Sequence, residues 1–257
     1  MVTDKVSPNS HLPPPDKVVF EATIERPAAA ARGAVAGPTV FRVLRSTEID
    51  AYEQHVSAAG VEPFGAAPGT AADTFAGTAR KAAKLSLSAA KTAEFADMAV
   101  LVDSLTPEKT MLKLKPPIAT DATSTRVKQE ERNVKVRAFL YAASRETDND
   151  FHLIVGRAST AKPPVYMTVE VSGLPATSSK AFAALKSTRD AYKSFFAAHM
   201  PGPTYDFYDP PIPVTIEGSL FFDMSHAQGG RPGPATLRPH MPTIWEIHPL
   251  SSIAFGA

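Results

Sequence analysis

The stretch IEGSLFFDMSHAQGGRPGPATLRPHMPTIWEIHPLSSIAF, residues Ile216–Phe255, decides the fold that we predict. Two apolar runs flank a segment rich in glycine and proline, a pattern that indicates two β-strands joined by a loop. No other stretch is so dense in side chains that titrate near neutral pH or bind metal ions, so we place the candidate site here. The titratable residues at the edges of the loop are Asp223, His226, His240, Glu246 and His248.

Three more strands and one helix are expected upstream of this stretch. Asn133–Ala143 alternates between two sets of side chains, as a strand with two distinct faces does. Phe151–Val155 and Val165–Val171 are short apolar runs bounded by turn residues, which also favours strands. An apolar stripe at helical spacing then predicts one helix. Its members are Phe182, Leu185, Tyr192, Phe195 and Phe196.

The predicted order is therefore three strands, one helix and two strands. This is the order of an OB-fold, a five-stranded Greek-key barrel. Because no helix separates the first three strands, a parallel sheet built from βαβ units is disfavoured, and the alternative is another α+β arrangement of the same elements. Gly218 suits a bend or bulge in the fourth strand. We thus predict an α+β protein with a C-terminal OB-like five-stranded β-barrel (β-β-β-α-β-β) over residues 126–257.

The N-terminal half carries weaker patterns. Residues 1–17 are polar and rich in proline, which is typical of a disordered tail. Thr47 is a good helix cap, and a helix to about Ala59 is expected after it. Residues 71–105 are rich in alanine, lysine and leucine, with apolar residues at spacings of three and four that favour a helix. We predict that residues 18–125 form a mostly helical N-terminal region and linker.

The charge balance argues against several classes of partner. With 27 basic and 26 acidic side chains, the sequence gives no indication of binding to nucleic acid or to an anionic membrane. Arg80, Lys81, Lys84 and Lys91 would form a basic face of the expected helix, and we interpret them as a solvated surface rather than a nucleic-acid or lipid site.

The cysteine content and the lengths of the apolar runs exclude further kinds of site and further classes of protein. The chain has no cysteine, which excludes disulfides, thiolate metal ligands and a cysteine nucleophile. No apolar run approaches the roughly 18–20 residues that cross a bilayer. The first residues show no basic segment followed by an apolar one, so we expect no signal peptide and a cytoplasmic protein.

The candidate site depends on strand alternation. Asp148, Asp150 and His152 are spaced by two and point to one face if that segment is extended. Glu246 and His248 likewise share a face of the last strand. If the polar faces of the strands coincide, they form one patch. Its predicted members are Asp148, Asp150, His152, Glu170, Asp223, His226, Glu246 and His248.

Histidine and carboxylate ligands together suit zinc, manganese or iron, so a divalent metal is the cofactor to expect. A Glu–His pair can also act as acid and base. The alternative is that each histidine is hydrogen-bonded to a neighbouring acid and only orients a loop. The residues that we predict as metal ligands are His152, Asp223, His226, Glu246 and His248.

The blocks DNDFHLIV, YMTVEV, GSLFFDMSH and IWEIHP resemble the recurring blocks of an uncharacterised bacterial family. In that family an acidic turn leads into a histidine-containing strand, and the chain closes on an E-[LI]-H-P block. The resemblance covers about residues 133–255. It implies a small OB-like β-barrel in which the eight patch residues matter together, and it carries no activity with it.

Three functions remain open from the sequence. The first is a ligand- or metal-binding β-barrel module without catalysis of its own, because no nucleophile elbow, P-loop, Rossmann glycine pattern or H-E-x-x-H motif is present. The second is a metal-dependent hydrolase, directed for example at phosphodiesters, that uses the same residues. The third is a structural or interaction protein whose helical N-terminal half docks a protein partner.

Overall fold

The computed structural model describes residues 11–26, 39–50, 73–227 and 230–256. The strands in these ranges are β1 (Val18–Arg26), β2 (Thr39–Ser46), β3 (Thr92–Phe95), β4 (Asn133–Arg145), β5 (Phe151–Gly156), β6 (Tyr166–Val171), β7 (Asp206–Phe222) and β8 (Trp245–Phe255). The α-helices are α2 (Lys81–Lys84), α3 (Met98–Asp103), α4 (Glu108–Met111) and α5 (Phe182–Phe196). Short 3-10 helices are η1 (Pro15–Lys17), η3 (Lys128–Glu130), η4 (Ala197–His199) and η5 (Arg238–His240).

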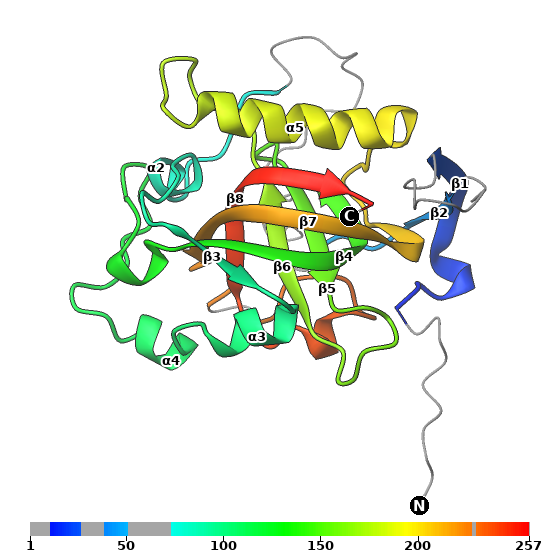
Figure 1. Ribbon diagram of the computed structural model, residues 1–257, viewed down its shortest axis with the longest axis horizontal. Helices are drawn as coiled ribbons and strands as arrows, with labels where there is room; N and C mark the ends of the chain where they lie inside the picture. Colours follow the sequence, from blue (N-terminus) through cyan, green and yellow to red (C-terminus); the bar gives the residue numbers. More distant parts are fainter. Residues whose placement is uncertain (1–10, 27–38, 51–72, 228–229, 257) are drawn as a thin grey trace, which may run out of the picture.

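The strands form one sheet in the order β1-β2-β7-β8-β6-β5-β4-β3, and β7 also pairs with β4 (Figure 1). That extra pairing joins β4, β5, β6, β8 and β7 into a ring. The ring is not a regular barrel, because β6 and β8 are held together by two residue pairs only and the β7–β8 and β4–β7 registers shift. The 17-residue strand β7 is long enough to pair with β2 as well, so the sheet continues beyond the ring.

The predicted fold class, an OB-like five-stranded β-barrel preceded by a mostly helical region, is wrong. The N-terminal half contributes β1, β2 and β3 to the same sheet as the C-terminal half, and its helices α2, α3 and α4 are short. The hypothesis that a helical N-terminal half docks a protein partner therefore has no structural basis. The expected tail and the Thr47–Ala59 helix fall mostly outside the described residues.

The expected helix over residues 71–105 is interrupted for a physical reason. Thr92–Phe95 leaves the helical conformation to pair in parallel with β4, and backbone pairing along the sheet outweighs the modest helix propensity of the segment. Asp97 then starts a new, short helix, because its carboxylate accepts a hydrogen bond of 2.7 Å from the backbone N–H of Ala99. Of the apolar residues whose spacing favoured this helix, only those within α3 therefore lie on a helix.

The individual elements predicted for the C-terminal half are confirmed. β4, β5, β6, β8 and α5 lie within a few residues of the expected ranges. β7 begins at Asp206, ten residues before the quoted stretch, because the proline-containing segment DFYDPPIP is part of the strand. Gly218 marks a register shift against β8, where an added Cβ would lie 2.4 Å from the carbonyl oxygen of Pro249. The strands approach too closely there for any side chain.

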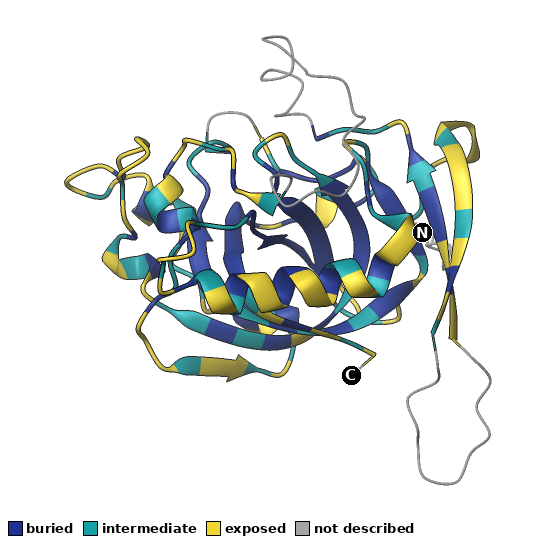
Figure 2. Ribbon diagram, turned by 90° about the horizontal axis from the view of Figure 1, so that it is seen from above, coloured by how far each residue is buried: buried dark blue, intermediate teal, exposed yellow. Residues whose placement is uncertain are grey.

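The hydrophobic core fills the ring and extends under α5, which lies across the strands with its polar side exposed (Figure 2). Leu185, Tyr192 and Phe196 of the predicted stripe are buried, whereas Phe182 and Phe195 are half-buried. Each large apolar side chain that is removed from water contributes roughly 1.5–3 kcal/mol, so this core carries the stability that allows polar groups to be buried elsewhere.

A buried ion pair fixes the end of β7. The guanidinium of Arg80 donates to both carboxylate oxygens of Glu130 at 2.7 Å. Glu130 also accepts a hydrogen bond of 2.8 Å from the N–H of Phe222, and Arg80 donates to the Phe222 carbonyl at 3.2 Å. The interpretation of Arg80 as part of a solvated basic surface is therefore wrong. The pair instead holds the residue that precedes Asp223.

Candidate metal centre

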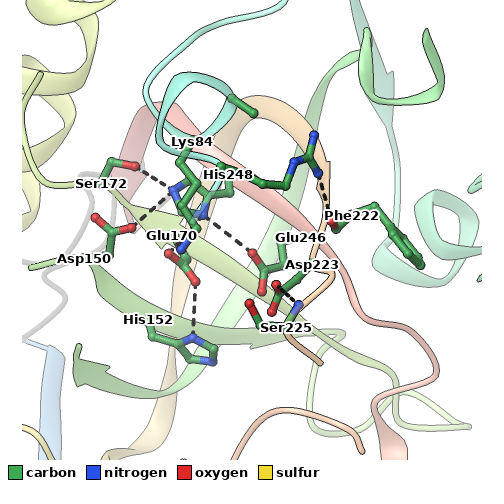
Figure 3. Close-up of polar contacts among 12 residues, drawn as sticks. Lys84, Asp150, His152, Glu170, Ser172, Phe222, Asp223, Ser225, Glu246 and His248 are labelled. Carbon is green, nitrogen blue, oxygen red and sulfur yellow. Dashed lines mark hydrogen bonds and ion pairs between the residues drawn. The ribbon is translucent and has the colours of Figure 1, made fainter. Parts of the chain in front are cut away.

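Strand pairing brings acids and imidazoles from three neighbouring strands together (Figure 3). His152 of β5 lies directly opposite Glu170 of β6, and Thr168 of β6 lies opposite Glu246 of β8. Directly opposed residues in a sheet have Cβ atoms roughly 4.5–5.5 Å apart, so their side chains meet on the same face. His248 follows Glu246 by two residues and therefore shares this face.

Glu170 lies between two imidazoles. Its Oε1 is 3.4 Å from Nδ1 of His152, and its Oε2 is 3.0 Å from Nδ1 of His248. Oε1 of Glu146 is 2.8 Å from the same Nδ1 of His152. On the far side of His248, Nε2 is 2.9 Å from the Ser172 hydroxyl and 3.3 Å from Oδ2 of Asp150. The carboxylate of Glu170 is thus the centre of the cluster.

Most of these close approaches are ion pairs, and the Ser172 hydroxyl forms a hydrogen bond with Nε2 of His248. Within the described ranges, Nε2 of His152 has no hydrogen-bond partner, and Oε2 of Glu170, Nδ1 of His248 and Oδ2 of Asp150 are held by ion pairs alone. All four residues are at most 2% exposed. Leaving a buried polar group unsatisfied costs about 1–3 kcal/mol, and more for charged groups. The ion pairs offset part of this cost, and they leave further lone pairs of these carboxylates available to a metal ion.

The separations match those of ligands around one ion. Metal–ligand bonds of about 2.0–2.2 Å place neighbouring ligand atoms roughly 2.8–3.6 Å apart in octahedral or tetrahedral geometry. The observed nitrogen–oxygen distances of 2.8, 3.4 and 3.0 Å fall in this interval. The arrangement is suited to hold a metal ion as well as protons.

Protons neutralise part of the cluster. Burial lowers the pKa of His152, but Glu146 and Glu170 outweigh it and hold that pKa well above its ordinary value. The pKa of His248 is raised well above its ordinary value in the same way, chiefly by Glu170 against burial. Burial also acts on Glu170, but His248 and Lys84 outweigh it and keep the pKa of its carboxyl well below the ordinary value. Glu170 is therefore a carboxylate between two cationic imidazoles.

Other carboxyl groups of the cluster have pKa values above the ordinary range, because they are buried. Burial, assisted by Asp148, raises the pKa of Asp150 to about 7. Burial and the negative charge of Glu170 raise the pKa of Glu246 to about 7. Burial and Glu170 also raise the pKa of Glu146 well above its ordinary value. The site carries more acidic groups than its imidazoles can neutralise.

A second pair of groups lies beside this cluster. Asp223 follows the end of β7 and contacts His226 directly through Nδ1. Burial lowers the pKa of His226, but Asp223 and Asp50 outweigh it and raise the pKa to about 10. Glu246 completes a group of three potential ligands with these two residues.

A cavity of about 310 Å³ opens over the cluster. Lys84 lies at its wall with Nζ 3.2 Å from Oδ2 of Asp148. Burial lowers the pKa of Lys84, but Asp148 and further acids outweigh it and keep that pKa well above the ordinary value. The cavity gives ions and small molecules a route to the cluster. Its ionisable lining residues are Asp50, Lys84, Glu146, Asp148, Glu170, Asp223 and His226.

All eight residues of the predicted patch converge here. Asp150, His152, Glu170, Asp223, His226, Glu246 and His248 belong to potential ligand groups, whereas Asp148 lines the cavity without joining one. His240, noted at the edge of the loop, is exposed and lies outside these groups.

Three residues of the site are not among those predicted from the sequence: Glu146, Lys84 and Asp50. Glu146 continues the two-residue spacing backward from His152, so this pattern could have revealed it. Lys84 and Asp50 are brought in by the tertiary fold alone. The aromatic side chains Tyr205 and Trp245 are at most 1% exposed and pack in the interior.

Comparison with protein-family models, with curated proteins and with solved structures finds no match for this chain. None of the helices in the described ranges has the length and apolar character that a membrane-spanning helix requires.

Proposed function

We propose that the protein binds a divalent metal ion in the buried cluster formed by Glu146, Asp150, His152, Glu170 and His248. The observation that carries this proposal is the position of Glu170. Its two carboxylate oxygens face two buried imidazoles at ligand-like distances, in ion pairs that bonds to a metal ion would replace. A cation bound among them would satisfy these lone pairs together.

The donor set narrows the kind of ion. Imidazole favours zinc, iron and related ions, whereas carboxylates favour manganese and magnesium. A cluster of two histidines and three carboxyl groups is mixed, so zinc, manganese and iron are the ions to test. The absence of cysteine from the chain removes thiolate as a competing ligand.

Metal analysis tests the proposal directly. The full chain is treated with chelator, dialysed against Mn²⁺ or Zn²⁺ and analysed for metal content. Glu170→Gln keeps the side-chain volume but removes the charge, and it is expected to lose the metal. Glu217→Gln is the matched control, because Glu217 lies on β7 and accepts a hydrogen bond from Thr92, outside the cluster. Wild-type protein that binds no metal, or a Glu170→Gln variant that binds it normally, contradicts the proposal.

Metal binding is expected to release protons. His152 and His248 have raised pKa values and are protonated at neutral pH, but a metal ligand must be a neutral imidazole. At lower pH, protons compete more strongly with the metal ion for the imidazoles. The affinity for the metal ion should therefore fall. Calorimetric titration in buffers of different ionisation enthalpy measures the protons released. Affinity that stays constant between roughly pH 6 and 8 would count against this exchange.

Metal-dependent hydrolysis is the second candidate, and the cavity favours it. The Asp223–His226 pair and Lys84 line the same cavity as Glu146 and Glu170, so a substrate there would meet the metal, a proton-transfer group and a cation together. A generic phosphodiester assayed with Mn²⁺ tests it. Turnover that disappears with chelator and in His226→Gln supports hydrolysis. A metal-loaded protein without turnover supports binding alone.

A further inference from the structure

We infer that the cluster holds two divalent cations, bridged by the carboxylate of Glu170. This inference rests on the proposed metal binding and adds the number of ions and their arrangement. It is carried by the way in which the potential ligands divide around Glu170.

The ligands form two groups that share one residue. Glu146, His152 and Glu170 have potential ligand atoms that all lie within 4.8 Å of one another. Asp150, Glu170 and His248 form a second group within the same limit. Each group has its own imidazole and its own additional carboxyl group. Only Glu170 belongs to both.

The two oxygens of Glu170 face in different directions. Oε1 is directed to His152 and Oε2 to His248, which are on β5 and β8 respectively. One ion placed between Oε1 and His152 would leave Oε2 and His248 outside its coordination, paired only with each other and with neighbouring side chains. Two ions bridged by this carboxylate would use both. In protein sites with two metal ions, the ions are about 3.5–4 Å apart, a spacing that a bridging carboxylate spans.

The charge of the site favours two dications over one. Seven carboxyl groups surround the cluster and its cavity, against one lysine and three histidines. The carboxyl groups outnumber these basic side chains by three, so a second dication has carboxylate ligands that can offset its charge. The carboxyl groups are Asp50, Glu146, Asp148, Asp150, Glu170, Asp223 and Glu246.

The group of Asp223, His226 and Glu246 is not assigned a third ion. Its imidazole contacts the carboxylate of Asp223 directly, whereas Nε2 of His152 has no hydrogen bond within the described part of the chain. This pair therefore satisfies itself. Its place at the cavity suits proton transfer rather than metal binding.

The two sites differ in access. Glu146 and Glu170 line the cavity, whereas Asp150 and His248 do not. The ion held with His152 should therefore exchange faster with solution than the ion held with His248. Chelator is expected to remove the two ions in two kinetic phases.

Titration of the chelator-treated full chain with Mn²⁺ tests the inference, with equilibrium dialysis to count ions and electron paramagnetic resonance to detect coupling between them. Two equivalents with an exchange-coupled spectrum support it. One equivalent, or two whose spectra are those of isolated ions, overturns the inference and leaves the proposed function standing. No bound Mn²⁺ or Zn²⁺ overturns both.

Variants of single residues test which side chains bind each ion. His152→Asn should retain one uncoupled equivalent, with affinity at the lost site reduced at least about 100-fold, because even residues that only support ligands change affinity by 10–100-fold. His240→Asn changes an exposed histidine outside the cluster and should keep both coupled ions. If His152→Asn does not fold, Glu146→Gln at the cavity wall makes the same test. Two coupled ions in either variant overturn the assignment.

Discussion

Saturating Zn²⁺ or Mn²⁺ should raise the melting temperature of the metal-free protein by roughly 5–11 °C, because the ion binds the folded cluster and finds no comparable site in the unfolded chain. At one hundred times the dissociation constant, a single ligand adds about 2.7 kcal/mol to the free energy of unfolding. For a chain of this size, each 1 kcal/mol shifts the melting temperature by roughly 2–4 °C. Differential scanning calorimetry with and without metal measures the shift.

The variants decide whether the cluster causes this shift. Glu170→Gln should show little difference between its metal-loaded and metal-free melting temperatures, since it removes the central carboxylate. Glu217→Gln should show the same shift as wild type. The comparison is made within each variant, so a change in metal-free stability does not affect it. An equal shift in Glu170→Gln would place the binding site elsewhere.

The part of the site that could be predicted from the sequence is the part that follows from strand alternation. His152, Glu170, Glu246 and His248 lie on predicted strands, and spacing by two fixes the face that each occupies. Their convergence then needs only that neighbouring strands pair in register, as β5 and β6 do at His152 and Glu170. Alternation is a local property of the backbone, so one sequence is enough to reveal it.

The N-terminal half could not be predicted in the same way. β3 is four residues long and exists because it pairs with β4, about forty residues away. Lys84 reaches Asp148 from a four-residue helix, and no local pattern marks either α2 or its direction. Such positions are set by packing between distant segments, which outweighs local propensity.

The candidate metal centre lies where the ring of strands is least regular. β6 and β8 pair only at Thr168–Glu246 and Val169–Ile247, immediately beside Glu170 and His248. A longer ladder would continue the pairing between these strands and bring their backbones together past this point. Local departures from ideal geometry are expected where function competes with stability. The short pairing between β6 and β8, which is also one reason why the ring is not a regular barrel, therefore leaves space for the acids and imidazoles.

Replacement of Arg80 should have the largest effect on stability. Arg80→Met leaves the carboxylate of Glu130, which is fully buried, without its counter-ion. Breaking a buried ion pair by removing one partner costs about 3–5 kcal/mol. Urea unfolding followed by circular dichroism measures the loss. Arg42→Met is the control, because Arg42 pairs with Glu21 at the surface and such pairs contribute about 0–1 kcal/mol.

A double variant separates the charge from the hydrogen bonds. Arg80→Met combined with Glu130→Gln removes the uncompensated charge, while the glutamine oxygen can still accept the hydrogen bond from the N–H of Phe222. Most of the loss should therefore be recovered, since the main penalty is the unpaired buried charge rather than the missing attraction. A double variant as unstable as Arg80→Met would show that the arginine acts through Phe222 instead. Because Phe222 precedes Asp223, metal affinity in the recovered variant also tests whether this pair only stabilises the fold or positions the edge of the site.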